Sequence, residues 1–297
     1  MTAVPALSVE LETQSTRTFR HVLSVIVRDP LSLASTIVII LFILIAIFAY
    51  QVAPYPAEGA GKTNVANTML APSAGHILGA DRLGRDMFSC VIMGARPALI
   101  VPIGVVVFAI LIGAPLGAIA DYKGGWVDEV IMRITDLFLA FPSLLLAMAI
   151  TSALGRGLQN AAIALIISWW PWYTRLVRGV TISLRERYFV EAARATGVRD
   201  SVIILRHILP NTISPILVQA TVDLGTVILA MGGLAFLGLG TQPPAPDWGL
   251  MVSEGRDYIL KQWWISTFPG IAIFIVVLAF NLLGDTLRDI FDPRQYR

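Results

Sequence analysis

Few side chains in this sequence are of the types that perform covalent or metal chemistry. There is a single cysteine, Cys90, so no disulfide can form within the chain, and a lone cysteine is most simply a small packing residue. The three histidines, His21, His76 and His207, are far apart in the chain and match no metal-ligand spacing. We therefore expect neither a catalytic centre nor a cofactor in this chain.

One short string resembles a nucleotide-binding motif without meeting its requirements. Gly61-Lys62-Thr63 matches the end of a phosphate-binding loop, but that loop needs a glycine five positions before Gly61, where Pro56 stands. The motif also needs a preceding strand and a following amphipathic helix, and the sequence predicts neither. If ATP and Mg²⁺ drive this protein, they are expected to bind to partner chains.

The most informative spacing lies within residues 183–210. A glutamate and two alanines are followed, after three residues, by a glycine. Nine residues later, the string His-Ile-Leu-Pro ends the segment. The residues that define the pattern are Glu191, Ala192, Ala193, Gly197, His207, Leu209 and Pro210. Small alanines let a helix approach a partner closely, and a glycine suits the left-handed position after a helix end. Asp200 is predicted to cap a second short helix.

Two interpretations of this segment follow from the residues alone. It is a helix that docks into a soluble partner protein, with the Glu191 carboxylate offered to a basic group. Alternatively, it is a surface helix–turn–helix that contacts lipid head groups or its own chain.

A second pair of candidate residues lies within apolar stretches. Asp223 is the only charge in residues 207–246, and a carboxylate inside a membrane is costly and usually faces a cavity or a partner. It is either a contact for a cationic group of a transported solute or a structural hydrogen-bonding group. Trp170, which lies between two further tryptophans, either lines the same path or anchors a helix at the membrane interface.

The elements that carry these residues are predicted to be membrane-spanning helices. The chain of 297 residues is 56% hydrophobic and 14% charged, with a mean hydropathy of +0.73, whereas soluble domains carry about 25% charged residues. A bilayer core requires about 20 apolar helical residues. Six intervals with one charge or none meet this need: 30–57, 97–120, 137–155, 157–174, 207–246 and 262–284.

Charge distribution predicts the orientation of these six spans. Most of the 22 lysines and arginines fall on the side of the membrane that holds the N-terminus, most densely in residues 175–206, and cytoplasmic loops carry such an excess. Both termini are therefore expected in the cytoplasm. Asp29 and Pro30 suit the N-cap and first position of the first span. No cleavable signal peptide is expected.

The sequence thus divides into four expected parts. Residues 1–29 form a cytoplasmic segment, with an amphipathic elbow near 17–28, and residues 30–94 form the first span and an outer loop. Residues 95–285 form a core of five spans that includes the inner loop at 183–210. Residues 286–297 form a cytoplasmic tail.

The inner-loop pattern resembles the E-A-A-x3-G-x9-I-x-L-P loop of permeases of ATP-binding-cassette (ABC) importers. The one departure is His207, where that pattern has isoleucine. Further motifs resemble the dipeptide, oligopeptide and nickel branch of these permeases, on the side of its dipeptide permease C-like members. They lie at 76–86, 236–249, 284–289 and 292–294, and the resemblance covers roughly residues 20–297.

This resemblance implies an all-α, polytopic fold of six transmembrane helices, of the MetI-like type found in type I ABC importers. It implies a bacterial inner-membrane complex with a second homologous permease, two ATP-binding-cassette ATPase subunits and an external solute-binding protein. The chain would form the path for dipeptides, oligopeptides, glutathione, nickel or a related solute by alternating access. The outer motifs either shape the mouth of that path or only fix loops. An ATP-independent secondary transporter or channel is the alternative.

Overall fold

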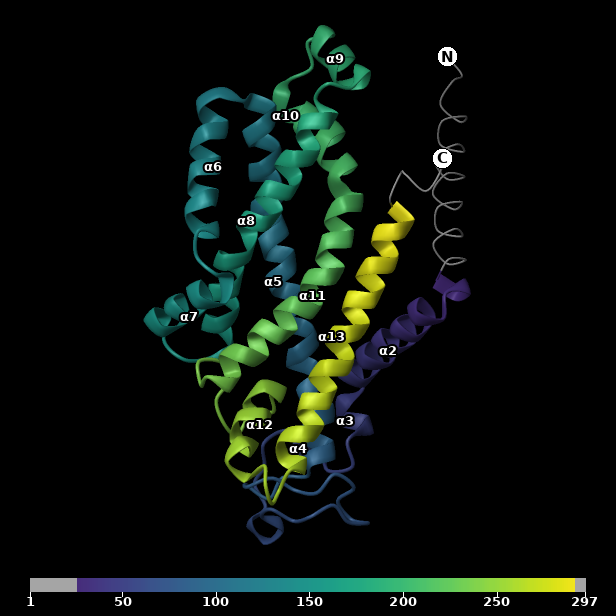
Figure 1. Cartoon of the computed structure of the whole chain (residues 1–297), viewed down its shortest axis with the longest axis vertical. Coiled ribbons are helices and arrows are strands. Elements are labelled where there is room, and N and C mark those ends of the chain that lie inside the picture. The colour runs from purple at the N-terminus through teal and green to yellow at the C-terminus, as the bar shows by residue number, and fades with distance from the viewer. Residues whose placement is uncertain (1–25, 292–297) are drawn as a thin grey trace.

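The structure is a computed structural model, and it describes residues 26–291. These residues are almost entirely helical and contain no β-strand, so the all-α prediction is confirmed for this part of the chain (Figure 1). Nearly all of the predicted elbow at 17–28, and the motif at 292–294, lie outside the described residues. The four-part division of the chain remains a prediction.

Within residues 26–291, six helical units are long enough to account for the six predicted spans. Four are both long and apolar enough to cross a membrane: α2, α5, α11 with the short turns before it, and α13. The pair α6 and α7 passes the same test jointly but is bent by 86°. The sixth is α8, which has 27 residues and carries tryptophans and arginines. The bounds are α2 Pro30–Ile47, α5 Met87–Lys123, α6 Gly125–Leu139, α7 Ser143–Leu154, α8 Leu158–Leu184, α11 Ile213–Phe236 and α13 Trp264–Phe291.

Shorter helices connect these units at both ends of the molecule. At one end, α9 and α10 project above the long helices, and at the other end α4 and α12 lie among loops (Figure 1). Their bounds, with those of the remaining short turns, are α3 Ala49–Val52, α4 Pro56–Gly59, η1 Val65–Asn67, α9 Tyr188–Ala195, α10 Asp200–Ile203, η2 Ile204–Ile208, η3 Leu209–Thr212, α12 Trp248–Gly255 and η4 Arg256–Tyr258.

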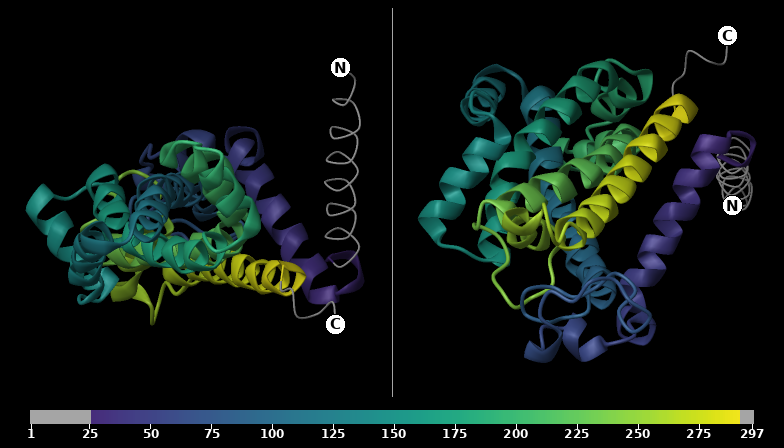
Figure 2. Two further views of the ribbon diagram at one scale, coloured as in Figure 1. Left: turned by 90° about the horizontal axis from the view of Figure 1, so that it is seen from above. Right: turned by 60° about the horizontal axis from the view of Figure 1, so that its bottom comes forward.

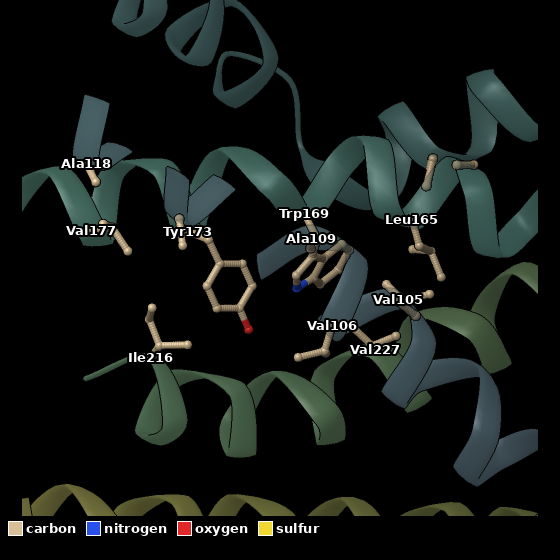
Figure 3. Packing of buried hydrophobic residues seen from close by; sticks show 14 of the residues in the cluster. Val105, Val106, Ala109, Ala118, Leu165, Trp169, Tyr173, Val177, Ile216 and Val227 are labelled. Carbon is tan, nitrogen blue, oxygen red and sulfur yellow. The ribbon is translucent and has the colours of Figure 1, made fainter. Parts of the chain in front are cut away.

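The core is organised around the long helices α5 and α8, which form the most extensive helix pair. Their backbones touch because α5 has glycines at the contact. A Cβ atom on Gly113 would lie 2.4 Å from the Trp170 carbonyl oxygen, and one on Gly117 would lie 2.3 Å from that of Thr174. Small residues permit this close approach in membrane helices. Valines and alanines of α5 pack with Leu165 of α8 and with α11 around this seam (Figure 3).

The first span, α2, packs against α13 on the opposite side of the molecule from α6 and α7 (Figure 2). Its start follows the sequence prediction: Asp29 is the N-cap, Pro30 opens the helix, and the Asp29 carboxylate accepts a bond from the Ser32 N–H at 2.8 Å. Phe42 of α2 contacts the ring of Phe280 in α13 at 6.4 Å between centroids. This helix is therefore a peripheral support for the α5–α8–α11 core.

The outer loops are joined by a buried network of charges, which we call the outer latch: Glu58, His76, Asp81, Arg85, Asp86 and Glu254. Its centre is Arg85, whose side chain is 1% exposed; Nε donates to Asp81 at 2.6 Å and Nη2 lies 3.4 Å from Glu254. Arg85 also donates to the backbone oxygen of Pro244. The latch therefore ties the segment before α5 to α12 and to the loop that precedes α12.

The rest of the latch satisfies the remaining carboxylates. Asp86 accepts from His76 at 2.9 Å and from the Ser89 N–H at 2.8 Å, which caps α5. Nearby, Asp247 caps α12 and accepts from the Thr241 hydroxyl. Burial raises the pKa of Asp247, and these hydrogen bonds partly oppose that rise. Within the chain, the motifs at 76–86 and 236–249 therefore fix the outer loops, which is one of the two roles that the sequence suggested for them.

Candidate functional site

The predicted inner-loop helix forms as α9 and stands at the end of the molecule opposite the latch (Figure 1). It ends as the sequence predicts, because Gly197 has φ +77°, in the left-handed region. The Gly197 N–H donates to the Arg194 carbonyl at 3.0 Å and the Val198 N–H donates to the Ala193 carbonyl at 3.1 Å. This pair of bonds is the Schellman motif. Nothing lies within 4 Å of a Cβ built on Gly197, so backbone conformation rather than space requires glycine.

The two faces of α9 differ in burial. Val190 is fully buried, and Ala193 packs against the main core. Glu191 and Ala192 are exposed, and the Glu191 carboxylate has no hydrogen-bond or ion-pair partner among residues 26–291. Tyr188, at the start of the helix, is 90% exposed. The exposed face therefore offers a carboxylate, a small residue and an aromatic ring to another molecule. Sequence reasoning missed Tyr188, although an aromatic residue beside the pattern was the signal.

Contacts with the inner end of α5 brace this loop. The Arg194 guanidinium lies over the Tyr122 ring, 4.6 Å from its centroid, and the Tyr122 hydroxyl donates to Asp200 at 3.1 Å. Arg185 donates to the backbone oxygen of Asp121 at 3.0 Å. The prediction that Asp200 caps the second helix is wrong: Arg199 occupies the N-cap and α10 begins at Asp200, whose carboxylate serves the Tyr122 hydroxyl instead.

The second half of the pattern connects α9 to α11. His207 lies in the π-helical turn η2 and contacts the ring of Phe189 from the α9 side, with centroids 6.3 Å apart. Leu209 and Pro210 open the tighter turn η3, and Leu209 packs against the main core. Proline has no N–H to continue a regular α-helical ladder, which accounts for a change of helical pitch at this point. The chain therefore runs from α9 to α11 through α10 and these two turns.

The two candidate path residues lie on different helices and are not neighbours. Asp223 of α11 is 7% exposed; one carboxylate oxygen accepts from Gln219 at 3.0 Å, and the other has no partner in the described part of the chain. Beside it are Trp169 and Tyr173, which point from α8 toward α11 (Figure 3). Trp170 instead packs edge-on against Phe138 of α6, with centroids 5.4 Å apart. The structure therefore does not bring Asp223 and Trp170 together.

Two ion pairs join α8 to α6. The helix α8 continues ten residues beyond the charge-free interval that ended at 174, so Arg175 and Arg178 lie within it. Arg178 binds Asp128 through two bonds of 2.6 Å each, and Arg175 binds Asp136 through one bond of 2.5 Å. Sequence reasoning assigned these arginines to a loop, because it could not see their partners about 40–50 residues earlier in the chain.

Comparisons with known proteins agree with this architecture. Residues 113–297 match the family described as binding-protein-dependent transport system inner membrane component, and residues 18–72 match the N-terminal TM domain of oligopeptide transport permease C. The inward-facing methionine ABC transporter MetNI contains a chain with the same fold, at a TM-score of 0.55 and 20% identity, covering 69% of this chain and 98% of that one.

Curated relatives match over most of their length. The dipeptide transport system permease protein DppC of Alkalihalophilus pseudofirmus is 48% identical over 267 residues, which are 90% of this chain and 87% of the relative. The glutathione transport system permease protein GsiD of Escherichia coli is 45% identical over 271 residues, 90% and 88% of the two chains. This chain therefore belongs to the family of binding-protein-dependent transport system inner membrane components, and is a multi-pass bacterial inner-membrane permease of an ABC importer.

Proposed function

We propose that this permease carries dipeptides, oligopeptides or a related small solute such as glutathione. We also propose that α9 is the coupling helix on which the ATPase subunits act. Two relatives are named as dipeptide and glutathione permeases, which supports a peptide-like solute. The working complex would contain a second homologous permease, two ATP-binding-cassette ATPases and a solute-binding protein outside the membrane. ATP and Mg²⁺ would bind to the ATPases, and this chain would hold no cofactor.

The exposed face of α9 is the observation that carries the coupling proposal. Glu191 and Ala192 are exposed beside a left-handed Gly197, while Val190 and the Arg194–Tyr122 contact fix the opposite side to the transmembrane core. A helix held in this way can enter a groove of a soluble partner and still transmit force inward. His207, Leu209 and Pro210 would carry that force into α11, and Tyr122 would carry it into α5.

The proposed cycle is alternating access. ATP binding draws the ATPases together, α9 moves with them, and the path opens outward to receive solute from the binding protein. Hydrolysis returns the path to its inward-facing state. Asp223 and Trp170 remain predicted path residues, and both termini are proposed to lie in the cytoplasm on the same side as α9.

Cysteine crosslinking in the assembled complex tests this proposal. We expect Ala192→Cys to crosslink to an ATPase subunit and Ile77→Cys, which is exposed among the outer loops, to give no such product. ATP should change the efficiency of the first crosslink, because the docked helix moves during the cycle. Failure of Ala192→Cys to capture a nucleotide-hydrolysing protein, or uptake that persists without ATP, would favour the secondary-transporter alternative.

A further inference from the structure

The helix α6 has two different exposed faces. Glu129, Arg133 and Asp136 are spaced by four and three residues, so they share one face, and all three are exposed. We call them the charged stripe. The neighbouring face is apolar and equally open: it carries Trp126, Val130, Ile134 and Leu137, which are between 47% and 75% exposed. A third face, which holds the buried Thr135, packs inward.

The charged stripe reaches the depth of the hydrocarbon core. Residues 97–120 of α5 carry no charge, so the inner limit of the apolar region lies near Asp121. Gly113 and Gly117 touch the α8 backbone beside Arg175, which places Arg175 about 6–12 Å inside that limit. Asp136 binds Arg175 directly, at 2.5 Å, and it lies eleven residues beyond Gly125, the first residue of α6, which is about 16 Å along the helix from its inner end.

An open ion pair at this depth cannot face lipid without a large cost. The side chains of Arg175 and Asp136 are 52% and 53% exposed, and charged groups within the membrane almost always face a water-filled cavity or a partner. The Asp136 carboxylate is too short to reach the interface by extending outward. The stripe must therefore meet water or another polar group, while the apolar face beside it suits lipid or protein.

The two ion pairs of α6 and α8 differ in how completely they are satisfied. Arg178 and Asp128 form two bonds, and their side chains are 31% and 22% exposed. The Arg175–Asp136 pair has one bond, and the second Asp136 oxygen and the remaining Arg175 nitrogens have no partner among the residues described. The Arg178–Asp128 pair therefore holds the two helices together. The Arg175–Asp136 pair still offers hydrogen-bond donors on Arg175 and an acceptor on Asp136.

We propose that the charged stripe and Arg175 line the solute path and that the Arg175–Asp136 pair binds zwitterionic peptides. The free carboxylate of the peptide would meet Arg175, and its ammonium group would meet Asp136. Because both ends of the peptide are charged, a site of two opposite charges compensates both during passage. This inference rests on the peptide-import function proposed above.

The first experiment measures dialanine uptake and ATP hydrolysis by the complete transporter, with its binding protein, in proteoliposomes. Asp136→Asn and Arg175→Gln should each lower the number of dialanine molecules moved per ATP by about tenfold, the effect of losing one charge-assisted contact. The matched variants Asp128→Asn and Arg178→Gln should lower uptake and hydrolysis together, because they loosen the helices and leave the ratio unchanged.

The outcomes separate the two proposals. Dialanine uptake that does not require ATP contradicts the proposed function itself. Uptake driven by ATP with an unchanged ratio in Asp136→Asn and Arg175→Gln contradicts only the binding site. A wild-type complex that hydrolyses ATP in response to its loaded binding protein but does not move dialanine also overturns the zwitterionic-peptide assignment.

A labelling experiment remains informative if the Asp136 and Arg175 variants fail to assemble. A membrane-impermeant, charged thiol reagent applied from the inner side should modify Arg133→Cys in the complete transporter and leave Ile134→Cys unmodified. The native Cys90 is buried and should not react. Equal labelling at both positions, or labelling of Ile134→Cys alone, would show that the stripe does not line a water-filled path.

Discussion

The two ends of this permease use charge in opposite ways. At the outer end, Arg85 is fully buried and each of its charged neighbours in the latch has a partner. At the inner end, Glu191 is exposed and has no partner in the described part of the chain, and Arg194 is held by a tyrosine ring rather than a carboxylate. A buried network that satisfies itself makes a rigid cap, whereas exposed groups with free hydrogen-bonding capacity make a surface for another protein.

The largest effect is expected at the latch, where Arg85→Met removes the buried cation that binds both Asp81 and Glu254. Removal of one member of a buried ion pair leaves an uncompensated charge, and the expected loss is about 3–5 kcal/mol of stability. The midpoint temperature of thermal unfolding of the purified permease complex should fall accordingly. The matched variant Arg82→Met should have little effect, because Arg82 binds the same Glu254 from a 43% exposed position.

If Arg82→Met were as damaging as Arg85→Met, burial would not explain the difference between the two ends. If neither variant altered unfolding, the latch would not be a rigid cap.

The next effect is expected at Gly197, where the inner loop depends on backbone conformation rather than on buried charge. A β-branched residue at φ +77° is strained by at least about 1–2 kcal/mol and would open the Schellman motif. Gly197→Val should therefore reduce ATP-driven uptake by tenfold or more while the protein still inserts into the membrane. Uptake by vesicles and the amount of permease in the same membranes, measured on one preparation, would distinguish a loss of transport from a loss of membrane insertion.

Gly104→Val is the control for this substitution. Gly104 lies in α5 without a positive φ, and nothing lies within 4 Å of a Cβ added there. The Gly104→Val variant should retain ATP-driven uptake. Normal transport by Gly197→Val would count strongly against a coupling role for α9.

Features of this structure could be predicted from the sequence where they depend on neighbouring residues, and not where they depend on residues far apart in the chain. Gly197 and the Asp29 cap were predictable because each depends on a few neighbouring residues. The length of α6 and of α8 was not, because their charged residues end the charge-free intervals and pair with one another only in the fold, across 39 and 50 residues of chain. The same holds for Arg85, whose partners Pro244 and Glu254 are more than 150 residues away in the chain.

The smallest effect is expected at Asp223, which lies between the two ends and shares features of both. Like Arg85 it is buried, and like Glu191 it has an oxygen without a partner among the described residues. Asp223→Asn retains the oxygen that accepts from Gln219 and removes only the charge. If this carboxylate meets a peptide amine when the path opens, uptake of peptides with a free amino terminus should fall by a few fold. That loss should be smaller than in Asp136→Asn, because Asp136 is exposed and Asp223 must first be uncovered.

Competition assays with a panel of peptides would measure this difference. Unchanged uptake of every peptide in the Asp223→Asn variant would show that the charge does not contact solute. Asp223 would then be a structural group that lies beside Trp169 and Tyr173 of α8. The solute-binding charges of this permease would then lie only on the side of α8 that faces α6.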